Sequence, residues 1–65
     1  MSIRNIARLR KEMKFTQESL ARKANVSYHT VIKLESGAIK NPKIETVLRI
    51  AKALNVSIDS LIEGG

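Results

Sequence analysis

The chain of 65 residues contains no cysteine and no tryptophan, and it has only one proline, one tyrosine and one phenylalanine. Without cysteine, neither a disulfide framework nor a thiolate zinc site is possible. A chain of this length buries only about 60% of its unfolded-chain surface. We therefore expect one domain over residues 1–65 with an aliphatic core, no deep catalytic cavity, no metal and no cofactor.

Long apolar segments are also missing. No apolar run approaches the ~18 residues that a membrane span requires. The first ten residues, MSIRNIARLR, lack the apolar stretch of a secretion signal. We expect a soluble, cytoplasmic protein with no membrane partner.

Acidic residues are few relative to basic ones. Twelve Lys and Arg stand against six Asp and Glu, which gives a formal net charge of +6. A polyanion is the natural partner of such a chain. Basic charge also keeps many small domains in solution, so charge alone leaves nucleic-acid binding and simple solvation as equal alternatives.

Apolar residues recur at helical spacing from the start of the sequence. Ile3, Ile6, Leu9 and Met13 lie three or four positions apart, as on a helix with one buried face. This pattern predicts a first helix of about three turns that ends near Lys14.

Two short helices with a tight link between them are predicted next. Thr16 is a good N-cap for a helix over Gln17–Ala24. Asn25 tolerates the left-handed backbone conformation that ends a helix. Ser27 can then cap a third helix that stops before Gly37.

The remainder of the chain predicts two more helices. Pro42 suits the first turn of a fourth helix, with Asn41 ahead of it as cap. Ser57 caps a last helix, which the tail Gly64-Gly65 ends. The residues expected to face inward are Ile44, Val47, Leu48, Ala51 and Leu54 in the fourth helix and Leu61 and Ile62 in the fifth. No strand or repeat is indicated, so the fold class is all-α.

The stretch TQESLARKANVSYHTVIKLESG resembles the helix-turn-helix of the phage repressor and Cro family, which includes many small bacterial regulators. IARLRKEMKFTQ is similar to the family's first helix, and NPKIETVLRIAKALNVSIDSLI to its fourth and fifth, so the resemblance covers essentially the whole chain. It implies a compact five-helix bundle of the lambda-repressor-like DNA-binding type, with the motif from Gln17 to Ser36. The matching positions are Gln17, Leu20, Ala21, Ala24, Val26, Val31 and Leu34.

Two positions depart from the family's usual pattern. Asn25 stands where the family often has Gly, and Lys43 where Ser or Thr often caps the fourth helix. Asn accepts the same backbone region as Gly, and Asn41 is a substitute cap. The same motif explains a small residue at Ala21, because the second and third helices must approach closely there.

One face of the third helix is the predicted base-reading surface. A rotation of about 100° per residue turns Val31, Leu34 and Glu35 inward. In a helix-turn-helix, the N-terminal part of this helix enters the major groove, where a lysine suits guanine and an isoleucine suits a thymine methyl group. The alternative is a helix surface that only faces solvent. It is disfavoured because Tyr28 and Ile32 would then be large apolar groups exposed without a partner. The predicted base-reading residues are Tyr28, His29, Ile32 and Lys33.

His29 has a second conceivable role as a metal ligand. It is the only histidine, and no cysteine accompanies it. We therefore do not expect a metal site.

Four residues are predicted to contact DNA phosphates: Gln17, Thr30, Lys40 and Lys43. Gln17 opens the second helix, where free backbone N–H groups favour a phosphate, and the resemblance assigns the matching glutamine such a contact. Thr30 flanks the reading helix, and the two lysines lie in the loop that follows it. Each residue also has a simpler role, as a helix-start residue, a helix-border residue or a solvated loop lysine.

Arg10 and Glu35 interrupt the inward sides of their helices. The resemblance pairs an arginine and a glutamate at these two positions. It therefore implies a structural ion pair that holds the first helix against the third.

The resemblance implies a sequence-specific transcription regulator, most simply a repressor, on bacterial or phage DNA in the cytoplasm. One short helix reads few bases. We therefore expect a homodimer that binds a palindromic operator, whose half-sites lie about 34 Å apart. The predicted dimer contact is formed by Ile58, Leu61 and Ile62, although the same residues can simply complete the core of the monomer.

Two other function classes compete with DNA binding. A protein-interaction module or antitoxin is the alternative function, but the outward Lys33 and its positive surroundings favour DNA. An enzyme is rejected because no paired carboxylates, no phosphate-binding loop and only one histidine are present. No small-molecule ligand is expected.

Overall fold

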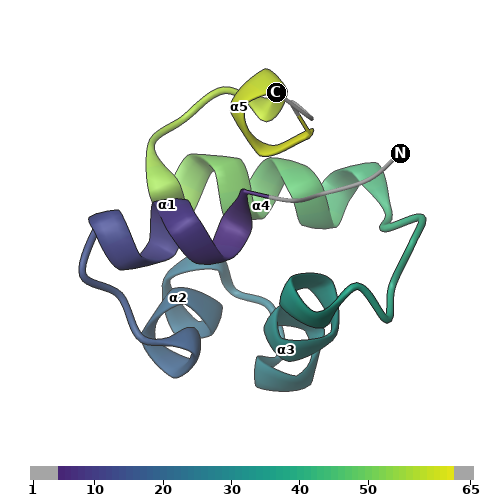
Figure 1. The fold of residues 1–65 in the computed structure, drawn as a ribbon, viewed down its shortest axis with the longest axis horizontal. Coiled ribbons are helices and arrows are strands. Elements are labelled where there is room, and N and C mark those ends of the chain that lie inside the picture. The colour runs from purple at the N-terminus through teal and green to yellow at the C-terminus, as the bar shows by residue number, and fades with distance from the viewer. Residues whose placement is uncertain (1–4, 63–65) are drawn as a thin grey trace.

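The structure, a computed structural model, describes residues 5–62. Within this range it contains five α-helices and no strand, which confirms the predicted all-α fold. None of these helices has the length and apolar character that crossing a membrane requires. The helices are α1 (Ile6–Glu12), α2 (Gln17–Ala24), α3 (Tyr28–Ser36), α4 (Ile44–Leu54) and α5 (Ile58–Ile62) (Figure 1).

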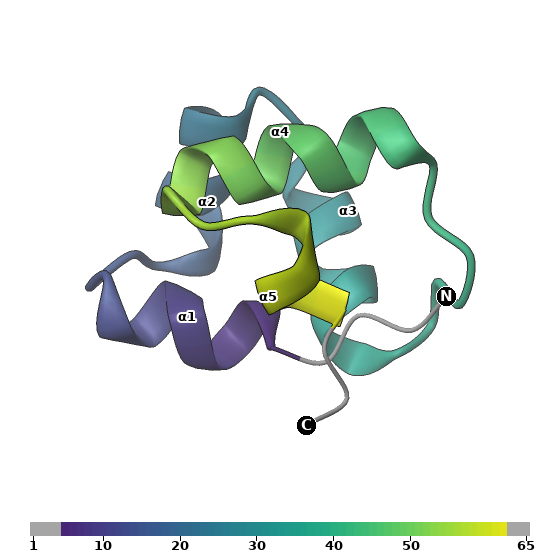
Figure 2. The same cartoon turned by 90° about the horizontal axis from the view of Figure 1, so that it is seen from above.

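The helices surround a core of aliphatic side chains. α4 lies over α2 and α3, while α1 and α5 lie beside it (Figure 2). Ala21 is only 3% exposed, and the small side chain allows α2 and α3 to pack closely. The fully buried large residues are Ile6, Leu20, Val31, Leu34, Val47, Ile50, Leu54 and Leu61.

α2 begins where Thr16 predicts it. The Thr16 hydroxyl accepts a hydrogen bond from the Ser19 backbone N–H at 3.0 Å. The Ser19 hydroxyl oxygen in turn accepts one from the Thr16 backbone N–H at 2.8 Å. Two N–H groups at the helix start are thus satisfied reciprocally, which fixes the first residue of α2.

The link between α2 and α3 has the predicted geometry. Asn25 adopts the left-handed conformation, with φ 58° and ψ 44°. The backbone N–H of Val26 then donates to the carbonyl of Ala21 at 3.0 Å, and the Ser27 hydroxyl accepts from the N–H of Thr30 at 3.1 Å. Gly37, with φ 85°, ends α3. The bounds of both helices therefore follow from capping chemistry.

α1 ends close to Lys14, as predicted, but the inward position predicted for Met13 was wrong. The helix ends at Glu12, and Lys14 takes a left-handed conformation with φ 62°. This turn leaves Met13 46% exposed and brings Phe15 against the core in its place. The predicted inward residue Ile3 lies outside the described residues.

The predicted start of α4 was also wrong. Its N-cap is Lys43, whose backbone is extended and whose side chain forms no capping hydrogen bond. The first helical bond runs from the N–H of Val47 to the carbonyl of Lys43 at 3.1 Å. Asn41 is therefore not the cap and Pro42 is not in the first turn, because the extended backbone at Lys43 delays the helix.

The buried stripe of α4 differs from the predicted one. Ile44 is 57% exposed and Leu48 is 49% exposed, although both were expected to face inward. Ile50 and Ala53 are buried instead, along with Val47, Ala51 and Leu54. The helix is turned in this way because α2 packs along the side that carries Ala53.

α5 closes the described part of the chain. The Ser57 hydroxyl accepts a hydrogen bond from the N–H of Ser60 at 3.3 Å, so the predicted cap is present. Leu61 is fully buried, and this corrects its assignment to a dimer contact, because a side chain inside the core cannot reach a second copy. Ile58 and Ile62 are partly buried and pack against the core. The predicted glycine tail lies outside the described residues.

Candidate nucleic-acid interface

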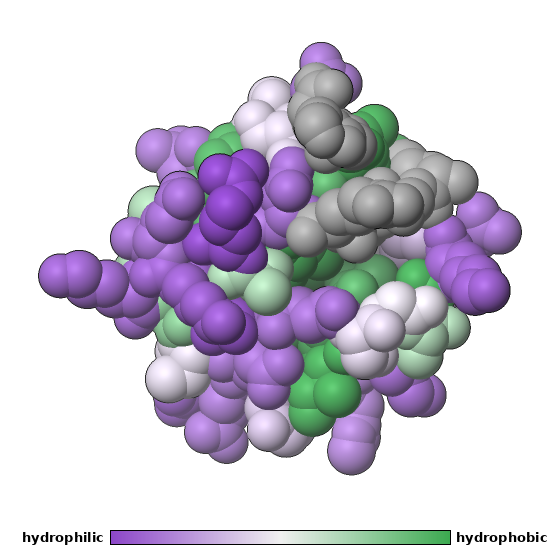
Figure 3. All heavy atoms as spheres, viewed as in Figure 1, coloured by the Kyte–Doolittle hydropathy of each residue, from purple (hydrophilic) through white to green (hydrophobic). Residues whose placement is uncertain are grey.

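The outward face of α3 carries the four predicted base-reading residues. Tyr28, His29 and Lys33 are exposed and Ile32 is half-buried, whereas Val31 is fully buried. The rings of Tyr28 and His29 lie side by side, with their centroids 6.1 Å apart. In the space-filling view, hydrophobic spheres interrupt a mostly hydrophilic surface over α3 (Figure 3). The face thus offers aromatic, aliphatic and cationic groups together.

No negative side chain lies on this outward face. Glu35 is the only acidic residue of α3, and its carboxylate is bound to Arg10 on the inward side. An unopposed Lys33 beside polar and apolar groups is well suited to an anionic partner.

Arg10 and Glu35 form a two-pronged ion pair between α1 and α3. The Nε atom of Arg10 lies 2.6 Å from Oε2 of Glu35, and Nη2 lies 3.2 Å from Oε1. Nη1 donates to the backbone carbonyl of Phe15 at 2.9 Å. The two side chains are only 11% and 9% exposed. Such parallel hydrogen bonds fix orientation as well as distance.

Gln17 joins this ion pair from the start of α2. Its Nε2 atom donates to Oε1 of Glu35 at 2.9 Å. Sequence reasoning assigned Gln17 to a phosphate and did not predict this bond, which joins residues 18 positions apart on different helices. The Glu35 carboxylate therefore connects α1, α2 and α3.

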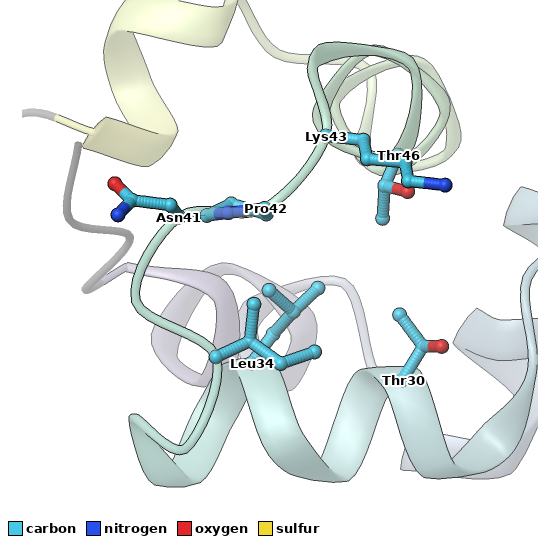
Figure 4. A pocket seen from close by; sticks show the side chains of 7 residues that line it. Thr30, Leu34, Asn41, Pro42, Lys43 and Thr46 are labelled. Carbon is cyan, nitrogen blue, oxygen red and sulfur yellow. The ribbon is translucent and has the colours of Figure 1, made fainter.

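A pocket of about 370 Å³ separates α3 from the beginning of α4. Thr30 lies on the α3 side of it, and Lys43 and Thr46 lie on the α4 side (Figure 4). The Thr30 hydroxyl shares a hydrogen bond of 2.7 Å with the Ser27 hydroxyl. Two of the predicted phosphate-binding residues, Thr30 and Lys43, thus line one pocket. Lys40 is exposed in the loop but does not line it.

The part of the chain that the structure describes contains no group of side chains that could bind a metal ion. No three His, Cys, Asp or Glu side chains of residues 5–62 gather closely enough to hold an ion.

Comparison with protein-family models matches residues 6–61 to a helix-turn-helix model. No curated protein sequence matches the chain. Several solved structures do match it, with closely similar folds.

The structure of SinR in a SinR–SinI complex is 29% identical in sequence to this chain and superposes with a TM-score of 0.87. The match covers 91% of this chain but only 57% of that one. SinR in complex with DNA, described as the master regulator for biofilm formation, is 29% identical with a TM-score of 0.82; the match covers 85% of this chain and 87% of that one. A related SinR structure gives the organism as Bacillus subtilis. The P22 c2 repressor bound to a synthetic operator is 32% identical with a TM-score of 0.82, and the match covers 92% and 89% of the two chains.

The ion pair leads to a stability prediction. Replacing Arg10 with Met leaves the Glu35 carboxylate, which is only 9% exposed, without its cationic partner and with only the hydrogen bond from Gln17. This should lower the free energy of unfolding by about 3–5 kcal/mol. The double variant Arg10→Met/Glu35→Leu should lose much less, because no unpaired charge is left. Urea denaturation followed by circular dichroism measures both.

Arg8→Met is the matched control. Arg8 pairs with Glu12 at 3.4 Å, but the two side chains are 62% and 59% exposed, so the expected loss is below about 1 kcal/mol. Equal losses in Arg10→Met and Arg8→Met would show that the inner ion pair does not stabilise the fold.

Proposed function

The chain belongs to the phage repressor and Cro family of helix-turn-helix proteins, and from this premise we propose that it binds double-stranded DNA sequence-specifically and regulates transcription. The observation that carries the proposal is the outward face of α3, which has a free lysine and no acidic side chain. SinR and the P22 c2 repressor, whose folds are similar, were solved with DNA and with an operator.

In the proposed complex, α3 lies in the major groove. Lys33 donates to the O6 and N7 acceptors of a guanine, and Ile32 contacts a thymine methyl group. Tyr28 and His29, which lie in the first turn of α3, contact neighbouring base edges. These groups supply sequence preference, because each base pair presents a distinct pattern in that groove.

The phosphates are bound around this helix. Thr30 and Lys43 face one pocket, and Lys40 extends from the adjoining loop. Gln17 lies at the start of α2, where backbone N–H groups also favour an anion. Its side-chain amide already donates one hydrogen bond to Glu35, and the amide has a second N–H that can donate to a phosphate. These contacts give affinity and register without sequence preference.

Residues 1–65 act as one DNA-binding domain, and two copies bind a palindromic operator. Ile58 and Ile62 supply the contact between the copies, because they reach the surface of α5 while Leu61 does not. A regulator of this kind works as a repressor when its operator overlaps a promoter. Its site of action is DNA in the bacterial cytoplasm, and it has no catalytic role.

Selection of binding sites from random duplexes, at about 0.15 M salt, tests this function. The expected product is an inverted repeat whose half-sites lie about 10 base pairs apart. Enrichment of a single half-site would contradict the dimer, and no enrichment at all would contradict sequence-specific binding.

The division between base and phosphate contacts is tested on the selected duplex. Lys33→Ala should cost about 1–3 kcal/mol of binding free energy and relax the preference at one base position. Lys40→Ala should weaken binding to all sequences alike and lower the slope of log K against log salt by about one. Fluorescence anisotropy over a salt series measures both effects. If the two variants behave alike, the assigned roles are wrong.

A further inference from the structure

Two large apolar side chains of α4 are exposed although the helix has a well-formed buried face. Ile44 is 57% exposed and Leu48 is 49% exposed. They lie one turn apart, so they form a continuous apolar surface. Glu45 and Lys52 are exposed beside them. We call these four residues the α4 strip; contiguous apolar surface of this kind marks an interaction site more often than scattered single residues do.

The α4 strip points away from α3. Thr46 faces the pocket that Thr30 and Leu34 line from α3 (Figure 4). Ile44 and Leu48 are each two residues from Thr46, which is a rotation of about 200° around the helix. The strip therefore stays accessible when α3 lies in the major groove.

The charges of the α4 strip are self-complementary. Glu45 lies three residues before Leu48 and Lys52 lies four residues after it, so both stand about 4.5–6 Å from Leu48 along the helix axis. A twofold axis across α4 at Leu48 makes two copies of the helix antiparallel. Each Leu48 then contacts its copy, and each Glu45 lies near Lys52 of the second copy.

The present partner of Glu45 does not prevent this arrangement. Glu45 lies 3.4 Å from Arg49, but the two side chains are 73% and 44% exposed. An exposed pair of this kind contributes little and rearranges easily. The aliphatic part of Lys52 can also cover Ile44 of the second copy, since Ile44 lies four residues from Leu48 on the other side.

We propose that a second copy of this chain docks on the α4 strip, back to back, so that the two α3 helices face opposite directions and hold two separate DNA segments. The inference rests on the proposed DNA binding of α3. It uses a surface different from the Ile58 and Ile62 contact between copies on one operator.

This pairing forms on DNA rather than in free solution. Few side chains take part, so the buried area falls below the roughly 1,000 Å² that a stable interface needs. Two free chains of net charge +6 also repel each other, whereas DNA neutralises that charge. Several copies on each duplex raise the effective concentration of the strips and allow weak contacts to accumulate.

A capture experiment tests the proposal. One duplex carrying several copies of the selected site is fixed on beads, a labelled duplex of the same sequence is free, and the protein is added. The wild-type protein should bring the labelled duplex to the beads. Ile44→Gln/Leu48→Gln should reduce capture about tenfold or more, equivalent to one decade in the pairing constant, while single-duplex binding by gel shift is unchanged. Met13→Gln, at a residue of similar exposure (46%) in α1's C-cap, should leave capture intact.

Charge exchange distinguishes pairing from general surface effects. Glu45→Lys and Lys52→Glu should each reduce capture relative to single-duplex binding, and the double variant should restore it. A double variant as defective as the singles, or capture that survives Ile44→Gln/Leu48→Gln, overturns the pairing. Intact single-duplex binding without any capture by the wild type also overturns it. Loss of single-duplex binding itself in the wild type would instead refute the proposed function, and this inference with it.

Discussion

The Glu35 carboxylate is the point on which the orientation of α3 depends. It accepts hydrogen bonds from Arg10 on α1 and from Gln17 at the start of α2. The same arginine also holds the backbone carbonyl of Phe15. Because the ion pair is almost buried, its geometry is restricted and weakly screened by salt. One side chain therefore fixes α3 relative to the two helices before it, and it removes the only negative charge of α3 from the outward face.

The sequence predicts best those features that are decided locally. Thr16, Asn25 and Ser27 each set a helix end through a bond or a backbone conformation within a few residues. The bounds of α2 and α3 and the outward orientation of the proposed base-reading residues could therefore be predicted. The ion pair of Arg10 with Glu35 was implied by family resemblance, since no local pattern connects positions 25 apart.

Some failures are local, at the end of α1 and the start of α4, and the others involve packing between elements that are distant in the sequence. Hydrophobic periodicity fixes the existence of α4 but not its rotation, and α2 turns it so that Leu48 is exposed. Met13 fits the spacing of α1 but lies past its end, because the chain reverses at Lys14. Leu61 was predicted to face inward and also to contact a second copy, and the core encloses it so that only the first role is possible. The bond from Gln17 to Glu35 escaped prediction because a side-chain hydrogen bond between helices leaves no pattern in the sequence.

The fold separates two surfaces that would serve different contacts. The outward face of α3 is built from residues that directly follow a capped turn. The α4 strip lies on the far side of the neighbouring helix and is apolar at its centre. A domain this small keeps both surfaces accessible at once because its core uses only one side of each helix.

The most direct test is to map the DNA contact by NMR. The backbone amide resonances of the protein are followed while the selected duplex is added at about 0.15 M salt. The account predicts the largest shifts from Ser27 to Lys33 and at the side-chain amide of Gln17, with small shifts at Leu48. Large shifts confined to α4 and α5, with α3 unchanged, would show that α3 is not the surface that contacts DNA.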